Sequence, residues 1–137
     1  MTDGLFIDSN VFLRHLLNDH PVMSPASRRL LKSVESGDVP AWTTPTVVSE
    51  VVWVLGGGTY YKQQAEIGRV VSEILRINGL AMEHRAELTR ACGLFAELNI
   101  DFADAYHASL LDSRGERRLY SYDRDFDRVT GLMRIEP

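Results

Sequence analysis

The sequence has a single cysteine, few prolines and no long hydrophobic segment. Cys92 is the only cysteine among 137 residues, which excludes an internal disulfide and a metal site built from several thiolates. The 5 prolines and 10 glycines are too few for a linker-rich or disordered chain. No apolar run approaches the ~20 residues that span a bilayer. These absences predict a soluble, cytoplasmic protein without a membrane segment, folded as one domain over residues 1–137.

Net charge leaves the class of binding partner open. The chain has 15 Lys and Arg against 19 Asp and Glu, a net charge of −4, which weakly disfavours a protein that coats nucleic acid. Four of the acids are singled out below as a candidate cation site, and without them the charges balance. An acidic total therefore does not exclude a nucleic-acid substrate.

Short apolar runs alternate with segments of helical periodicity along the whole chain. This alternation predicts crossover connections, a mostly parallel central sheet of four or five strands, and helices on both faces of it. The expected fold is therefore a three-layer α/β/α domain. Strands are expected at residues 5–7, 39–43, 79–82, 119–121 and 132–135, and helices at residues 11–17, 25–36, 45–55, 62–77, 85–98 and 101–114.

Four acidic residues occupy positions that such a sheet would bring together. Asp8 and Asp123 follow the first and fourth expected strands. They would therefore lie at the carboxyl ends of those strands, which is where ligands bind in open α/β sheets. Asp104 falls in the first turn of the last expected helix. Glu50 lies at the rim of an apolar helix face, where a carboxylate is costly to bury without a partner. The sequence thus predicts that these acids meet at one edge of the sheet.

Each acid also has a purely structural explanation. Asp8 could cap the helix that follows it, and Asp123 could cap the short turn after it. Asp101 followed by Asp104 has the spacing of a capping box. Glu50 has the weakest structural explanation, because its neighbours are nearly all apolar. No single one of these acids is sufficient evidence for a cation site, and the functional prediction depends on all four together.

A cluster of carboxylates requires a compensating cation or bound protons. Two carboxylates about 4 Å apart repel by roughly 4 kcal/mol at an effective dielectric constant near 20. The candidate ligands are all oxygens, which favours Mg²⁺ or Mn²⁺ over a structural zinc ion. Because Mg²⁺ commonly joins a few carboxylates to a substrate phosphate, the predicted site favours phosphate chemistry.

Other phosphate and acyl-transfer sites lack residues that they need. Asn10 stands where a phosphatase of the haloacid dehalogenase type has its second aspartate, and no Gly-x-x-x-x-Gly-Lys-Ser/Thr loop is present. Cys92 lies within an expected helix with no histidine beside it, and there is no Gly-x-Ser-x-Gly motif. Nucleophilic serine or cysteine catalysis is therefore unsupported.

Four segments between Phe6 and Phe126 carry a family resemblance, namely residues 6–14, 49–55, 101–108 and 121–126. In this order they resemble the motifs of PIN-domain nucleases, and the short single-domain form is most similar to VapC-type ribonuclease toxins. The resemblance implies an endoribonuclease that depends on Mg²⁺ or Mn²⁺, forms a homodimer and is held inactive by a cognate antitoxin.

The resemblance also assigns roles to individual residues. Asp8 and Asp104 are expected to ligate the metal directly. Asp123 and Glu50 are expected to complete its shell, and Glu50 is also expected to position the attacking water. Supporting roles fall on three further residues, namely Asn10, Asp101 and Ser121.

Contacts to RNA are less sharply predicted. Arg14 and Arg124 are candidates for phosphate contacts, although surface arginines are common. The aromatic residues Trp53, Tyr60 and Tyr61 could stack a base, but packing in the core or in a dimer is the more ordinary explanation. The competing functions are a non-catalytic RNA- or protein-binding module of the same fold and, less favoured, a metal-dependent phosphatase.

Overall fold

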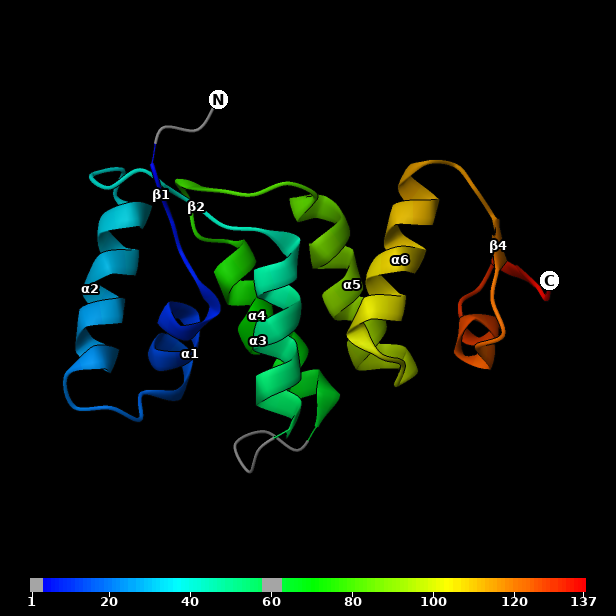
Figure 1. Ribbon diagram of the computed structural model, residues 1–137, viewed down its shortest axis with the longest axis horizontal. Helices are drawn as coiled ribbons and strands as arrows, with labels where there is room; N and C mark the ends of the chain where they lie inside the picture. Colours follow the sequence, from blue (N-terminus) through cyan, green and yellow to red (C-terminus); the bar gives the residue numbers. More distant parts are fainter. Residues whose placement is uncertain (1–3, 58–62) are drawn as a thin grey trace.

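The computed structural model describes residues 4–57 and 63–137, so Tyr60 and Tyr61 lie outside the described residues. Strands and helices alternate as predicted (Figure 1). In chain order the elements are β1 (Leu5–Phe6), α1 (Ser9–Leu17), α2 (Met23–Glu35), β2 (Ala41–Trp42), α3 (Pro45–Gly57), α4 (Gln64–Leu75), β3 (Leu80–Ala81), α5 (Arg85–Leu98), α6 (Phe102–Ser113), β4 (Arg118–Tyr120), the 3-10 helix η1 (Arg124–Arg128) and β5 (Met133–Ile135).

The α/β class and the parallel pairing of strands are confirmed, but the five strands do not form one sheet. The order β1-β2-β3 forms one parallel sheet, and β4 and β5 form a second. Between β3 and β4 the chain runs through α5 and α6, which pack against each other. Figure 1 shows that these helices place β4 at the opposite end of the molecule from β1. The prediction of a single central sheet is corrected in this respect.

Helices pack in a row that follows the chain. Close contacts join α1 to α3, α3 to α4, α4 to α5 and α5 to α6, and α2 covers α1. The buried face of α3 includes Val47, Val51 and Leu55, and α4 contributes Val71 and Ile74 to the same hydrophobic core. This face of α3 explains its orientation, because burying aliphatic side chains is the main favourable term in helix docking.

The ends of β1 and β2 are fixed by hydrogen bonds that continue the first sheet. The Ile7 amide donates to the Trp42 carbonyl at 2.9 Å, and the Thr43 hydroxyl donates back to the Ile7 carbonyl at 2.9 Å. The Thr44 hydroxyl then accepts from the Val47 amide at 3.2 Å, at the start of α3. The two bonds to Ile7 hold the chain directly before Asp8. No helix within the described part of the chain is long and apolar enough to cross a membrane.

Candidate functional site

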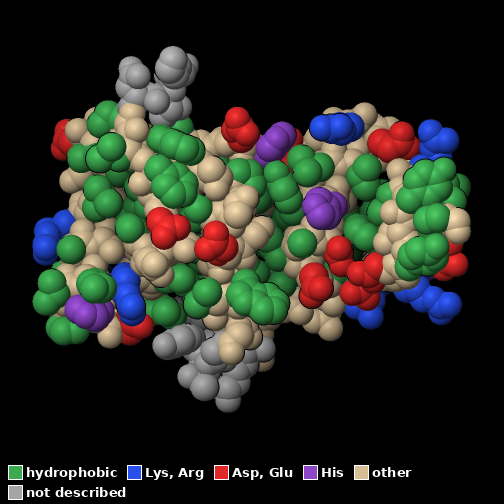
Figure 2. All heavy atoms as spheres, in the orientation of Figure 1, with side chains coloured by type: hydrophobic (Ala, Val, Ile, Leu, Met, Phe, Trp, Pro, Cys, Tyr) green, Lys and Arg blue, Asp and Glu red, His purple; other side chains and the backbone are tan. Residues whose placement is uncertain are grey.

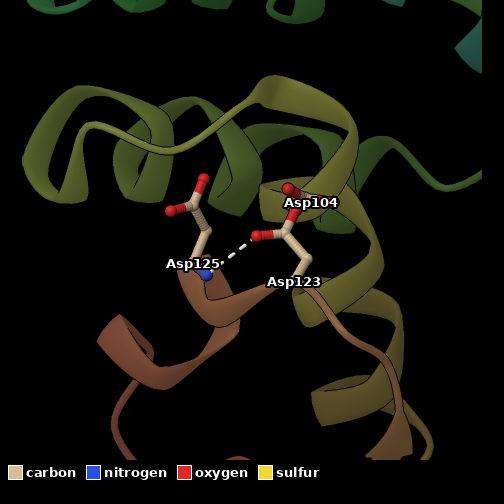
Figure 3. A group of neighbouring side chains, drawn as sticks. All are labelled: Asp104, Asp123 and Asp125. Carbon is tan, nitrogen blue, oxygen red and sulfur yellow. Dashed lines mark hydrogen bonds between the residues drawn. The ribbon is translucent and has the colours of Figure 1, made fainter.

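Three aspartates converge between α6 and the turn that follows β4. Single carboxylate oxygens of Asp104, Asp123 and Asp125 all lie within 4.8 Å of one another. Asp104 projects from the first turn of α6, whereas Asp123 and Asp125 come from the start of η1 (Figure 3). We refer to these three residues as the acidic cluster. Among the described residues, no other group of three or more acids, histidines or cysteines is this close.

Backbone hydrogen bonds hold the η1 side of the acidic cluster in place. The Asp125 amide donates to a carboxylate oxygen of Asp123 at 2.9 Å, so the predicted capping role of Asp123 is present (Figure 3). Ser121 supports the same turn, because its hydroxyl accepts from the Asp123 amide at 2.9 Å. Phe126 is the buried residue of η1, and burial of its ring stabilises the position of this helix. The hydrogen bonds that fix the turn therefore involve only one of the two carboxylate oxygens of Asp123.

The acidic cluster has little opposing positive charge among the described residues. The pKa of Asp104 is raised to about 6, first by partial burial and then by the hydrogen bond with Asp123 and the charges of Asp123, Asp101 and Asp125. Within residues 4–57 and 63–137, neither Asp104 nor Asp123 forms a salt bridge. Asp125 has only a long contact of 3.9 Å with Arg128. An all-oxygen donor set with only this one long ion pair fits a hard divalent cation such as Mg²⁺ or Mn²⁺.

The raised pKa of Asp104 predicts a pH-dependent loss of stability in metal-free protein. The folded protein keeps the Asp104 proton up to about pH 6, whereas the ordinary carboxyl loses it near 3.8. The proton therefore favours folding below pH 3.8, and this contribution is lost as pH rises through 6. Asp104→Asn should unfold at a higher temperature than the wild type at pH 7, with the difference shrinking toward pH 4.

Thermal unfolding in EDTA across this pH range measures the effect. Asp112→Asn is the matched control, because Asp112 lies on the same helix and is paired with Arg90 rather than with other acids. This control should not gain stability at pH 7. A stability difference for Asp104→Asn that is absent, negative or constant with pH would contradict the repulsion inferred here.

Asp8 and Glu50 lie outside the acidic cluster. Asp8 occupies the position before α1, but its side chain makes no capping hydrogen bond there. The neighbouring Ser9 hydroxyl donates to a carboxylate oxygen of Glu50 at 3.3 Å, which links the start of α1 to α3. Figure 2 shows acidic side chains in two groups on this face, one near the end of β1 and α3 and the other between α6 and η1. The structure thus divides the four predicted acids into two pairs.

A pocket lies between α3 and the start of α6. It has a volume of about 740 Å³, and its lining includes both Glu50 of α3 and Asp101 at the start of α6. The Asp101 side chain does not cap α6, so the capping-box explanation of this residue is not realised. A second pocket of about 440 Å³ lies on the other side of α6, where Asp104 and Ser121 line it.

The remaining predicted residues lie at the surface. Asn10 and Arg124 are exposed, and Arg14 is paired with Asp19 at 3.2 Å. Asp125 is the cluster member that was missed as a site residue. The signal that could have found it is its position two residues after Asp123, because an Asx-type turn brings such a residue back beside the first.

Comparison with known proteins places the chain in a family. The PIN domain family matches residues 5–132, and no curated protein matches. Among solved structures, the chain is similar to the crystal structure of VapC20 of Mycobacterium tuberculosis, described as a toxin that cleaves the sarcin–ricin loop. The identity is 15% and the TM-score 0.43, with 98% of this chain and 100% of that chain covered. The match over residues 5–132 shows that this chain belongs to the PIN domain family.

Proposed function

We propose that this protein is an endoribonuclease that hydrolyses RNA phosphodiester bonds with the help of Mg²⁺ or Mn²⁺. The observation that carries the proposal is the acidic cluster, in which three carboxylates meet with one long ion pair, to Arg128, and one carboxyl has a pKa raised to about 6. Membership of the PIN domain family supports the same activity. Perturbed carboxylates of this kind concentrate at functional sites.

Asp104 and Asp123 would hold the divalent cation, with Asp125 beside them. When bound, the cation neutralises charge on the scissile phosphate and lowers the pKa of a coordinated water. Ser121 keeps Asp123 in position through its bond to the Asp123 amide. In-line attack of water on phosphorus breaks the bond to the 3′ oxygen and leaves 5′-phosphate and 3′-hydroxyl ends.

Asp8 and Glu50 would act from the opposite side of the substrate. Glu50 would orient the attacking water, and the Ser9 hydroxyl would hold the Glu50 carboxylate through the 3.3 Å bond. Asp8 would add a further carboxylate beside them. The pocket lined by Glu50 and Asp101 would give RNA a place beside Glu50.

The two acidic groups would come together if β1 and β4 paired. In the part of the chain that is described, β1 pairs only with β2 and β4 only with β5, so each has one free edge. Leu5 is 78% exposed and Tyr120 76% exposed at these edges. Free edges present unpaired backbone groups that readily add a strand. A parallel β1–β4 pair would bring Asp8 and Asp123 to the same edge of one sheet.

The proposed cellular role is that of the toxin of a toxin–antitoxin pair, a homodimer of the VapC type that a cognate antitoxin neutralises. Its support is the order of the four motifs between Phe6 and Phe126. Expression in a bacterial host should arrest growth, and the product of the adjacent gene should relieve the arrest. Growth unaffected by expression of an active nuclease would overturn this role.

Cleavage of total RNA tests the nuclease activity. We expect defined cuts in Mn²⁺ or Mg²⁺, 5′-phosphate and 3′-hydroxyl ends, and no cleavage in EDTA. A non-catalytic binding module would retain RNA without producing fragments, and a phosphatase would hydrolyse p-nitrophenyl phosphate while leaving RNA intact. Either of these results would contradict the proposed function.

A further inference from the structure

Helix α3 presents a second, polar face that is not used in the core. Thr46, Ser49, Glu50 and Trp53 recur at helical spacing on this face, and all four line the 740 Å³ pocket. Trp53 is 80% exposed, so the prediction that it packs in the core is wrong, while packing in a dimer stays a prediction. An indole exposed to this extent costs solvation free energy and is a common anchor for a bound partner.

The opposite wall of the pocket combines aromatic carbons with an unused carboxylate. Phe95 and Phe102 pack edge to face, with ring centres 5.9 Å apart, and both line the pocket. Asp101 stands next to them at the start of α6, and its oxygens make no capping bond. The pocket therefore offers a flat indole, apolar carbons and hydrogen-bond acceptors to one occupant.

We propose that this pocket binds an unpaired nucleobase of the RNA substrate, stacked on Trp53, and this inference rests on the proposed function. A base has the flat surface that an exposed indole attracts, and stacking tolerates any base identity. Glu50 and Asp101 disfavour a phosphate at this point, because their charges would repel it. The neutral base, rather than the backbone, is the part of RNA that fits.

The position of the pocket supports a nucleobase over a protein segment. Asp101 lies one helical turn before Asp104, and its charge acts on the Asp104 carboxyl. Asp101 thus lines the pocket and stands one turn from Asp104, a member of the acidic cluster that would receive the scissile phosphate. An RNA strand at the acidic cluster would place an unpaired base in this neighbouring pocket, whereas a duplex would keep its bases stacked and out of it.

The carboxylates also predict which base is preferred. Carboxylate oxygens accept from the exocyclic amino group of cytosine. Uracil has a carbonyl oxygen at the same ring position, which would face Asp101 without a donor. We expect cytosine to bind more tightly than uracil, and Asp101→Asn to reduce that preference, because an amide can donate as well as accept.

Tryptophan fluorescence tests the inference in full-length, metal-free protein, where binding is observed without cleavage. The chain has two tryptophans, and Trp42 serves as the internal control because it packs on Phe6 at 5.0 Å between ring centres, away from the pocket. Hexacytidylate should quench the Trp42→Phe protein, which retains Trp53. It should leave the Trp53→Phe protein, which retains Trp42, unchanged. Hexauridylate should quench less, and duplex RNA should not quench.

Fluorescence anisotropy of labelled hexacytidylate measures affinity in parallel. Trp53→Ala should weaken binding about tenfold, and Trp53→Tyr should retain most of it, because a tyrosine ring still stacks. Binding that survives Trp53→Ala unchanged, equal quenching in both single-tryptophan proteins, or absence of any binding would overturn the inference. So would a basic peptide that quenches Trp53 when RNA does not.

The nuclease proposal and this inference can fail separately. Divalent-dependent cleavage without Trp53 quenching would contradict the base-binding pocket and support the nuclease proposal. Specific quenching by hexacytidylate in a protein that never cleaves RNA would contradict the nuclease proposal and support a binding site for an unpaired base.

Discussion

Replacing Asp104 with Asn is expected to lower the rate of RNA cleavage by at least about a hundredfold in Mg²⁺ or Mn²⁺. The substitution preserves the size of the side chain and removes one negative charge from the acidic cluster. It also removes the carboxyl whose pKa burial and the neighbouring acids raise. The loss should therefore come from weaker cation binding rather than from unfolding, because repulsion in the metal-free protein falls.

Steady-state cleavage of a defined RNA, measured at several Mn²⁺ concentrations, checks this prediction. Asp112→Asn is the control on the same helix, where the carboxylate contacts Arg90, and it should cleave at the wild-type rate. High Mn²⁺ should rescue Asp104→Asn in part if the defect lies in cation binding. Full activity of Asp104→Asn at ordinary Mn²⁺ would exclude the acidic cluster as the catalytic centre.

Glu50→Gln is expected to reduce cleavage by about tenfold to a hundredfold. The amide keeps a hydrogen bond with the Ser9 hydroxyl, which lies 3.3 Å from the carboxylate, but it cannot take up a proton from the attacking water. Asp8→Asn should have a comparable effect, since Asp8 directly precedes Ser9. The expected loss is in kcat, because Glu50 is proposed to act on water and not on the cation.

Glu97→Gln on α5 is the control for this series, because Glu97 is exposed and forms no ion pair among the described residues. Hydrogen exchange provides an independent measurement on the wild type. Pairing of β1 with β4 should protect the backbone amides of residues 5–7 and 118–120 when Mn²⁺ and RNA are added. Wild-type cleavage by Glu50→Gln, with no added protection of these amides, would separate Asp8 and Glu50 from the chemistry.

The types and order of the elements were readable from periodicity, but the division of the sheet was not. Alternating apolar runs predict strands and crossover helices, and each strand is found close to its predicted position. Strands of two or three residues carry little information about which neighbour they pair with. The path of α5 and α6 decides whether β4 reaches β1, and that path depends on helix packing that periodicity does not encode.

In the candidate site, too, local sequence predicted individual residues but not the contacts that depend on tertiary packing. Asp104 and Asp123 were singled out from their places at a helix start and after a strand, and the structure brings them together. The proximity of Asp125 follows from the turn at Asp123, which the sequence suggested only as a cap. The separation of Glu50 from the cluster follows from the divided sheet. The exposure of Trp53 could not be predicted from the sequence, because a tryptophan among valines in an apolar helix favours burial.

Calorimetric titration of metal-free protein with MnCl₂ at pH 7.5 tests the central claim most directly. We predict a saturable site in the wild type that is weakened at least about tenfold by Asp104→Asn and by Asp123→Asn, while Asp112→Asn binds normally. Equal Mn²⁺ affinity in all four proteins, or no binding by the wild type, would show that the acidic cluster does not hold the cation.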